Sequence, residues 1–185
     1  DVTIRMKSKR FDAAGQWRTP ADGIKSVDVR FTDSRYEHTE YEGSEAGTVF
    51  RNDGWQGRID VVHDRLGAFE GAFGVQALDF DFSALGAEGF LPPTNTRAFA
   101  AFLYEETRIG DWKLSLGARY DNTRVKADAD ERFGEALSRT FNSGAVSLGA
   151  AHTLTPQYSL VSSLTYTARP PNYQELFADG PHVAT

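Results

Sequence analysis

Two alternating segments joined by a tight turn, between Thr96 and Asp121, constrain the fold more than any other stretch of this chain. Alternate positions of the two segments are apolar, at Ala98, Ala100, Phe102 and Tyr104 and then at Trp112, Leu114, Leu116, Ala118 and Tyr120. The positions between them include Arg97, Glu105, Lys113, Arg119 and Asp121. A period of two with one apolar and one charged face predicts a half-exposed antiparallel hairpin. Ile109-Gly110-Asp111 supplies the backbone freedom that a tight turn needs.

The same alternation recurs along the whole chain and predicts about eight strands. Short turns are expected near residues 20, 66, 110 and 155, and longer, more polar links near 43, 88, 133 and beyond 169. A transmembrane barrel has short turns at one rim and long loops at the other, whereas a soluble sandwich has no reason to sort its links in this way. This alternation of link lengths is the feature that favours a membrane barrel.

Composition excludes other classes of protein. The mean hydropathy is −0.46, 25% of residues are charged, and no run approaches the roughly 18 apolar residues of a spanning helix. Barrel strands dilute the hydropathy signal, so these values are compatible with a transmembrane barrel. A net charge of −6 disfavours nucleic-acid binding, and the absence of cysteine excludes disulfides and thiol chemistry.

Aromatic residues stand at the ends of the apolar stripes, which is typical of the girdles at the two interfaces of an apolar band about 25 Å tall. The residues concerned are Tyr104, Trp112, Tyr120, Tyr158 and Tyr166. The prediction is therefore an all-β protein, an antiparallel transmembrane β-barrel segment of about eight strands. Lipid is expected to contact Ala98, Phe102, Leu114, Leu116 and Ala118, and the lumen to contain Arg97, Lys113, Arg119 and Asp121.

Several stretches resemble TonB-dependent outer-membrane receptors, most closely the branch of receptors for zinc or other metals. They are FRNDGWQGRIDVVHD, GAFGVQALDFDFSALGAEGFLPPTNTRAFAAFLYEE, DWKLSLGARYD and TARPPNYQELFADGPHVAT. The resemblance implies a 22-stranded barrel with a plugged lumen, in the bacterial outer membrane, that takes up scarce nutrients with energy delivered by TonB.

Residues 1–185 contain neither the plug and TonB box nor the terminal aromatic strand of that family. The expectation is a fragment of one β-barrel domain that requires lipid and its remaining strands, or self-association, to cover its edges. TonB would act on it through the missing plug.

Four residues are candidate metal ligands. His182 follows Asp179, with Glu175 nearby, on the predicted loop rim, and imidazole together with carboxylate oxygen suits zinc. His38 shares a strand face with Glu40 and Glu42 if the strand extends that far. Zinc enters as transported cargo, and no cofactor is expected. His63 and His152 lie near short turns and are expected to be structural.

The sequence gives no support for an enzyme, because no nucleophile, phosphate loop or helical metal motif is present. Glu105 and Glu106 are adjacent in a strand and point to opposite faces, so they are unsuited to act as a matched acid–base pair. Three alternatives stay open: a haem or siderophore receptor of the same family, a complete small structural or adhesive outer-membrane barrel, and a soluble ligand-binding barrel with its apolar stripes inward.

Overall fold

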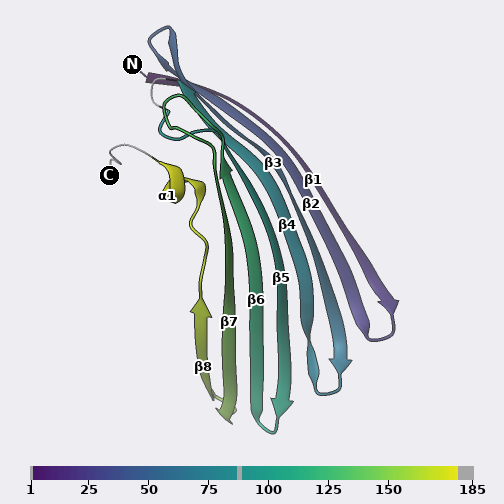
Figure 1. Ribbon diagram of the computed structural model, residues 1–185. Coiled ribbons are helices and arrows are strands. Elements are labelled where there is room, and N and C mark those ends of the chain that lie inside the picture. Colours follow the sequence, from purple (N-terminus) through teal and green to yellow (C-terminus); the bar gives the residue numbers. More distant parts are fainter. Residues whose placement is uncertain (1, 87–88, 179–185) are drawn as a thin grey trace.

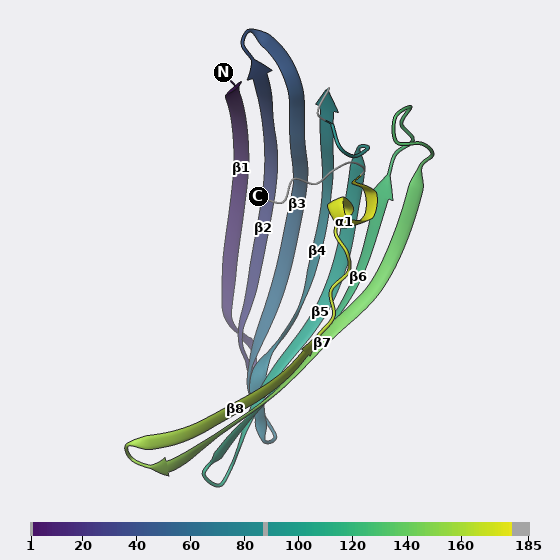
Figure 2. The same ribbon diagram turned by 90° about the vertical axis from the view of Figure 1, so that its left-hand side faces the viewer.

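The computed structural model describes residues 2–86 and 89–178, most of which form one antiparallel sheet (Figure 1). Its strands pair in chain order: β1 (Val2–Ala21), β2 (Ile24–Glu42), β3 (Glu45–Leu66), β4 (Phe69–Gly86), β5 (Thr94–Ile109), β6 (Trp112–Ala127), β7 (Leu137–Thr155) and β8 (Tyr158–Thr167). A short helix, α1 (Tyr173–Phe177), follows. Within the described residues β1 and β8 share no ladder, so the sheet is open (Figure 2).

The open sheet confirms the predicted class and count of strands, and it does not have the closure that a complete small barrel requires. The described helix α1 is too short to cross a membrane.

All links at one rim of the sheet are two-residue turns, as predicted. They lie between Ala21 and Ile24, Leu66 and Phe69, Ile109 and Trp112, and Thr155 and Tyr158. Gly67 and Gly110 have φ of 65° and 58°, a region in which a side chain would be strained.

At the other rim, one expected long link is wrong. Longer links do separate Gly86 from Thr94 and Ala127 from Leu137, but only Gly43 and Ser44 separate β2 from β3. The polar stretch before Gly43 is strand, because its backbone is paired with β3 up to Glu42 opposite Glu45. Polar side chains do not prevent such pairing, because the ladder joins backbone groups. The hairpin of β2 and β3 therefore projects as a long polar ribbon.

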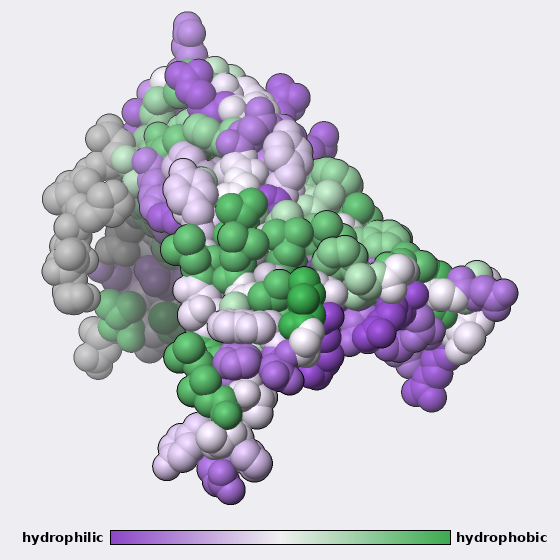
Figure 3. Space-filling view, turned by 90° about the horizontal axis from the view of Figure 1, so that it is seen from below, coloured by the Kyte–Doolittle hydropathy of each residue, from purple (hydrophilic) through white to green (hydrophobic). Residues whose placement is uncertain are grey.

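One face of the sheet is apolar over its full width. A single row of cross-strand partners runs across all eight strands without a polar side chain other than one tyrosine hydroxyl: Trp17, Val27, Val61, Phe73, Leu103, Ala118, Val146 and Tyr166. The next row is Gly15, Val29, Ile59, Val75, Ala101, Tyr120 and Gly144. In Figure 3 hydrophobic residues form a broad patch across the middle of the molecule, with hydrophilic residues toward its tips. An apolar surface of this extent requires an apolar solvent or another protein to cover it.

The opposite face, on which α1 lies, is concave (Figures 1 and 2). It is also more polar. Its rows include Asp28, Asp60, Gly74, Phe102 and Arg119, and then Arg30, Arg58, Gln76, Ala100 and Asp121. We call this the inner face and the apolar one the outer face.

The hairpin of β5 and β6 corrects the predicted orientation of one strand. Leu114, Leu116 and Ala118 are on the outer face, and Lys113, Arg119 and Asp121 on the inner face, as expected. In β5 the assignment is reversed, because Phe102 pairs with Arg119 and Leu103 pairs with Ala118. Ala98 and Phe102 therefore point inward, and Arg97 points outward, where its Nε lies 2.8 Å from Asp79 Oδ2.

The cause is the two-residue turn, which pairs Ile109 with Trp112 and so pairs every even-numbered residue of β5 with an odd-numbered residue of β6. Tyr104 is consequently on the inner face, where its hydroxyl donates to Glu106 Oε1 at 2.6 Å, and its assignment to an outer aromatic girdle is wrong. Trp112, Tyr120 and Tyr166 are on the outer face, as girdle residues must be.

Nitroxide labels on β5 of the receptor that contains this chain, reconstituted in lipid bilayers, test this register. Labels at Phe99 and Leu103 should be accessible to oxygen, which dissolves in lipid, and labels at Ala98 and Phe102 should not. A label at Leu116 on β6 serves as the lipid-facing reference. Oxygen accessibility at the even-numbered positions of β5 would contradict the assigned faces.

Candidate functional site

The chain leaves the sheet after β8 and folds back over the inner face. We call residues 168–178 the strap. The backbone amide of Ala168 still donates to Gly144 O at 2.9 Å, but Pro170 and Pro171 have no amide hydrogen with which to continue a ladder. Helix α1 then begins at Tyr173, above β4, β5 and β6 in the view of Figure 2.

An ion pair and a capping box hold the strap in its compact shape. Asn172 caps α1, because its side-chain oxygen accepts from the amide of Glu175 at 2.8 Å, while Glu175 Oε2 accepts from the amide of Asn172 at 2.8 Å. Arg169 donates to both oxygens of Glu175, at 2.6 and 2.8 Å. The hydrogen bonds from Arg169, and then that from the Asn172 amide, lower the pKa of Glu175 from 4.5 to about 2.

Tyr173 anchors the strap to the wall. Its ring stacks on Phe82 with a centroid distance of 4.9 Å and meets Phe80 edge-on at 6.3 Å. Both phenylalanines belong to the inner face of β4. Burial raises the pKa of the Tyr173 hydroxyl. Aromatic contacts of this kind contribute about 0.5–1.5 kcal/mol each beyond the area that they bury.

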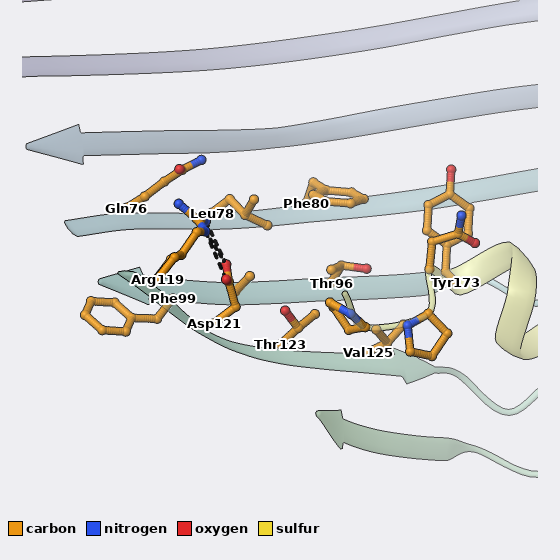
Figure 4. A pocket seen from close by; sticks show the side chains of 15 residues that line it. Gln76, Leu78, Phe80, Thr96, Phe99, Arg119, Asp121, Thr123, Val125 and Tyr173 are labelled. Carbon is orange, nitrogen blue, oxygen red and sulfur yellow. Dashed lines mark hydrogen bonds and ion pairs between the residues drawn. The ribbon is translucent and has the colours of Figure 1, made fainter. Parts of the chain in front are cut away.

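A pocket of about 270 Å³ lies between the strap and the inner face (Figure 4). One end is apolar, with Phe80, Val125, Pro171 and Tyr173, and the other is polar, with Gln76, Arg119 and Asp121. Thr96 lies between the two ends, is only 9% exposed, and has a hydroxyl oxygen with no hydrogen-bond partner within the described residues. A buried hydroxyl without a partner costs about 1–3 kcal/mol, so a group that enters the pocket and pairs with it would recover that cost.

The charges on the inner wall are neutralised locally. Arg58 pairs with Asp60 and Arg119 with Asp121, each through three hydrogen bonds of 2.7–3.0 Å between residues two apart on one strand. Phe102 lies beneath the Arg58 guanidinium, 4.3 Å from the ring centroid. A Cβ at Gly74 would clash with the Phe102 ring and the Ile59 carbonyl, so this close packing requires glycine.

The structure does not bring the predicted metal ligands together. Asp179 and His182 lie outside the described residues. Glu175 is in α1, and both of its carboxylate oxygens accept hydrogen bonds from Arg169. Within residues 2–86 and 89–178 no three His, Asp or Glu side chains form a group that suits a metal ion.

His38 lies on the inner face of the projecting hairpin of β2 and β3. The strand does extend to Glu42, so His38, Glu40 and Glu42 share a face, as expected. His38 Nε2 lies 3.8 Å from Glu40 Oε1, and its ring stacks on Phe50 at 4.5 Å. His38 Nδ1 is buried without a partner among the described residues.

His63 and His152 make structural contacts at the other rim. His63 is 3% exposed and contacts Glu105 Oε1 at 2.9 Å and Asp64 O at 2.7 Å. His152 stacks on Trp112 at 4.4 Å. Glu105 and Glu106 point to opposite faces, as predicted, since Glu105 contacts His63 and Glu106 contacts Lys113 at 2.8 Å.

Sequence reasoning did not identify the pocket. Its residues are drawn from β4, β5, β6 and the strap, and Tyr173 and Phe82 are 91 positions apart. The signal available in the sequence was Asn172 followed three residues later by Glu175, which predicts a capped helical turn. It does not say where that turn docks.

Comparison with known proteins shows which family this chain matches and which solved structures have a similar fold. A family model described as "TonB dependent receptor-like, beta-barrel" matches residues 3–185. Among solved structures, the copper transporter OprC is similar with a TM-score of 0.73 at 16% identity, over 91% of this chain and 32% of that one. The ferric citrate transporter FecA, in its unliganded form, is similar with a TM-score of 0.58 at 15% identity, over 88% of this chain and 27% of that one.

At these identities the structural likeness shows a shared fold, and this chain spans about a third or less of the length of either transporter. The family match covers almost the whole chain, with its alternating strands, short-turn rim and two-faced wall. This chain belongs to the TonB-dependent receptor-like β-barrel family.

Proposed function

We propose that this chain is part of the wall of an outer-membrane receptor that takes up a metal ion or metal complex by TonB-coupled transport, with zinc as the favoured cargo. The wall would belong to a larger barrel with a plugged lumen, of the kind that 22 strands form. TonB would act through a plug, and lipid would cover the outer face. No catalytic step is assigned to it.

The observation that carries this proposal is the pocket on the inner face. It is closed on one side by the strap, combines an apolar end with the Arg119–Asp121 pair, and contains the unpaired hydroxyl of Thr96. A site on the inner wall of a transport barrel can contact what passes through it or the plug that gates it. The outer face, apolar in one row across all eight strands and in a second row from β1 to β7, supports the placement in a membrane.

The proposed cargo is supported by the chemistry of the candidate ligands. Imidazole and carboxylate suit zinc, and we propose His182, Asp179, Glu175 and His38 as the groups that capture it. For Glu175 this role requires Arg169 to release its carboxylate. The named transporters of similar fold carry copper and ferric citrate, so haem or a siderophore remains the alternative cargo class.

Copper is a second candidate within the metal class, because Met6 of β1 is the direct cross-strand partner of His38. A thioether is a soft ligand that selects Cu(I), whereas zinc prefers imidazole and carboxylate. We therefore expect Met6 to be a ligand for Cu(I) but not for zinc.

Filling the pocket tests its role in uptake. In the full-length receptor, Ala98→Trp places an indole in the pocket, and we expect receptor-dependent uptake to fall several-fold while insertion into the membrane is retained. Ala101→Trp is the matched control, because Ala101 lies three residues away on the same strand and pairs with Tyr120 on the outer face. Equal uptake by the two variants would remove the pocket from the transport path.

Removing histidines tests the metal. His182→Ala and His38→Ala should each weaken zinc binding by the full-length receptor by at least about tenfold. Even the loss of a group that only hydrogen-bonds to a metal ligand lowers metal affinity by about tenfold or more. His152→Ala, at the opposite rim, is the control. Titration calorimetry with zinc, and a parallel titration with Cu(I) on Met6→Leu, separates the two cargoes. Unchanged affinity in both histidine variants would refute the site, though not the fold.

The Arg169–Glu175 clamp predicts how docking of the strap depends on pH. The pKa of Glu175 is lower in the folded chain than its usual 4.5, so the clamp's contribution is fully present above about pH 4.5 and is lost as the pH falls toward about 2. Spin labels at Gln174 and Asn52 of the full receptor should give one narrow distance distribution from neutral pH to about pH 4, and a distribution that broadens as the pH falls from there toward about 2.

Glu175→Gln should broaden that distribution already at neutral pH, whereas Glu135→Gln, in the exposed link after β6, should not. A distribution that stays narrow in Glu175→Gln would show that the contact of Tyr173 with β4 holds the strap without the clamp.

A further inference from the structure

Four cations stand together on the outer face of β1, β2 and β3, at the rim with the longer links. Lys7, Lys9, Arg35 and Arg51 line one shallow pocket of about 300 Å³, and we call them the outer basic patch. Lys9 is the direct partner of Arg35, and Lys7 and Arg51 flank Glu37 from its two sides. All four therefore point to the same side of the sheet.

The patch has more positive charge than its neighbours neutralise. Glu37 accepts from Arg51 at 2.8 Å, and Asp53 accepts from the backbone amide of Tyr36 at 3.2 Å. Lys7, Lys9 and Arg35 form no ion pair within the described residues 2–86 and 89–178, and their side chains are exposed. One row further out, Arg5 adds a fourth unpaired charge above the ring of Tyr41, 5.2 Å from its centroid.

The patch begins where the apolar surface ends. On β1 the outward positions run from Trp17 through Phe11 and then reach Lys9. On β3 the last apolar one before Asp53 and Arg51 is Trp55, and Val49 follows beyond them. Successive outward residues are about 6.6 Å apart along a strand. The head-group layer on each side of a bilayer is about 5–7 Å thick. Lys9 and Arg35, one step beyond Phe11, therefore lie at head-group depth when the apolar rows lie in hydrocarbon, and Lys7 lies one step further out.

We propose that the outer basic patch binds the phosphate group of an anionic membrane lipid whose acyl chains cover the apolar rows next to it. Arg35 can donate to phosphate oxygens in bidentate geometry, and Lys7 and Lys9 add compact charge from the neighbouring strand. A cation near an anionic lipid surface contributes about 1 kcal/mol. This inference rests on the membrane placement in the proposed function, and not on the cargo.

A lipid fits the surface better than a free anion or an acidic peptide. On β1 Lys9 directly follows the apolar positions, whereas Asp33 on β2 and Asp53 on β3 stand between the apolar residues and the cations. An amphipathic ligand with a phosphate head and acyl chains therefore contacts both parts along β1. Inorganic phosphate would contact only the cations, and an acidic peptide would leave the apolar rows exposed.

The test uses the full-length receptor in nanodiscs of phosphatidylcholine with or without a minor fraction of phosphatidic acid. Native mass spectrometry after release counts the phosphatidic acid that stays bound, and a thermal melt measures its protection. Lys7→Glu with Lys9→Glu should lower the affinity by at least about fivefold per lysine, from the contribution of about 1 kcal/mol for each cation, and should abolish the protection.

The matched control is Lys25→Glu with Arg65→Glu, which makes the same change in charge at the two-residue-turn rim. It should retain phosphatidic acid like the unchanged receptor. Lys9→Gln is a milder variant that tests the same point without reversing charge, and it should lose about fivefold in affinity.

Equal retention of phosphatidic acid by the patch variants and the control would overturn the proposal. Protection by added inorganic phosphate equal to that by phosphatidic acid would also overturn it, because the patch would then be a general anion site. A receptor that takes up its cargo normally but shows no patch-dependent retention contradicts this inference alone. Failure of the unchanged receptor to enter the nanodisc contradicts the membrane placement, and this inference with it.

Discussion

The two-residue turns at one rim are the constraint on which the rest of the wall depends. A turn of fixed length, together with any register shift beside it, fixes which residues of neighbouring strands face each other, and the period of two then assigns the later residues to a face. The turn at Gly110 and Asp111 pairs Leu103 with Ala118 and Phe102 with Arg119. In the other three hairpins a one-residue register shift lies next to the turn, between Arg18 and Ala21, His63 and Leu66, and Thr153 and Thr155. Beyond these shifts the apolar residues of all eight strands align into a continuous outer row.

Charges on the inner face are paired, some within single strands and some between neighbours, as Glu106 of β5 is with Lys113 of β6. Arg58 with Asp60 and Arg119 with Asp121 are each two residues apart, so both members of a pair necessarily lie on the same face. The strap uses the same chemistry, with Arg169 and Glu175. Because these charges are paired with one another, other buried groups are the ones that can still form hydrogen bonds. Among the described residues they include the Thr96 hydroxyl and His38 Nδ1.

Prediction from the sequence failed where the polarity of the residues was considered without knowing which residues pair across neighbouring strands. Ala98 and Phe102 look lipid-facing because they alternate with charged residues, yet Phe102 covers the guanidinium of Arg58, and Arg97 is paired with Asp79 on the outer face. The polar stretch before Gly43 looked like a loop for the same reason. In both places the backbone ladder, which is indifferent to side-chain polarity, decided the structure.

The amino-acid sequence by itself determined the class of the fold, the number of strands, the short-turn rim and the faces of β6. These follow from local properties, namely the period of two, the turn residues and the family resemblance of the stretches. Only the tertiary structure decided the inward side of β5, the docking of Tyr173 on Phe82 and the pocket beneath the strap. Those features join residues up to 97 positions apart, as Gln76 and Tyr173 are in the pocket. No local pattern specifies which distant surface a capped turn will contact.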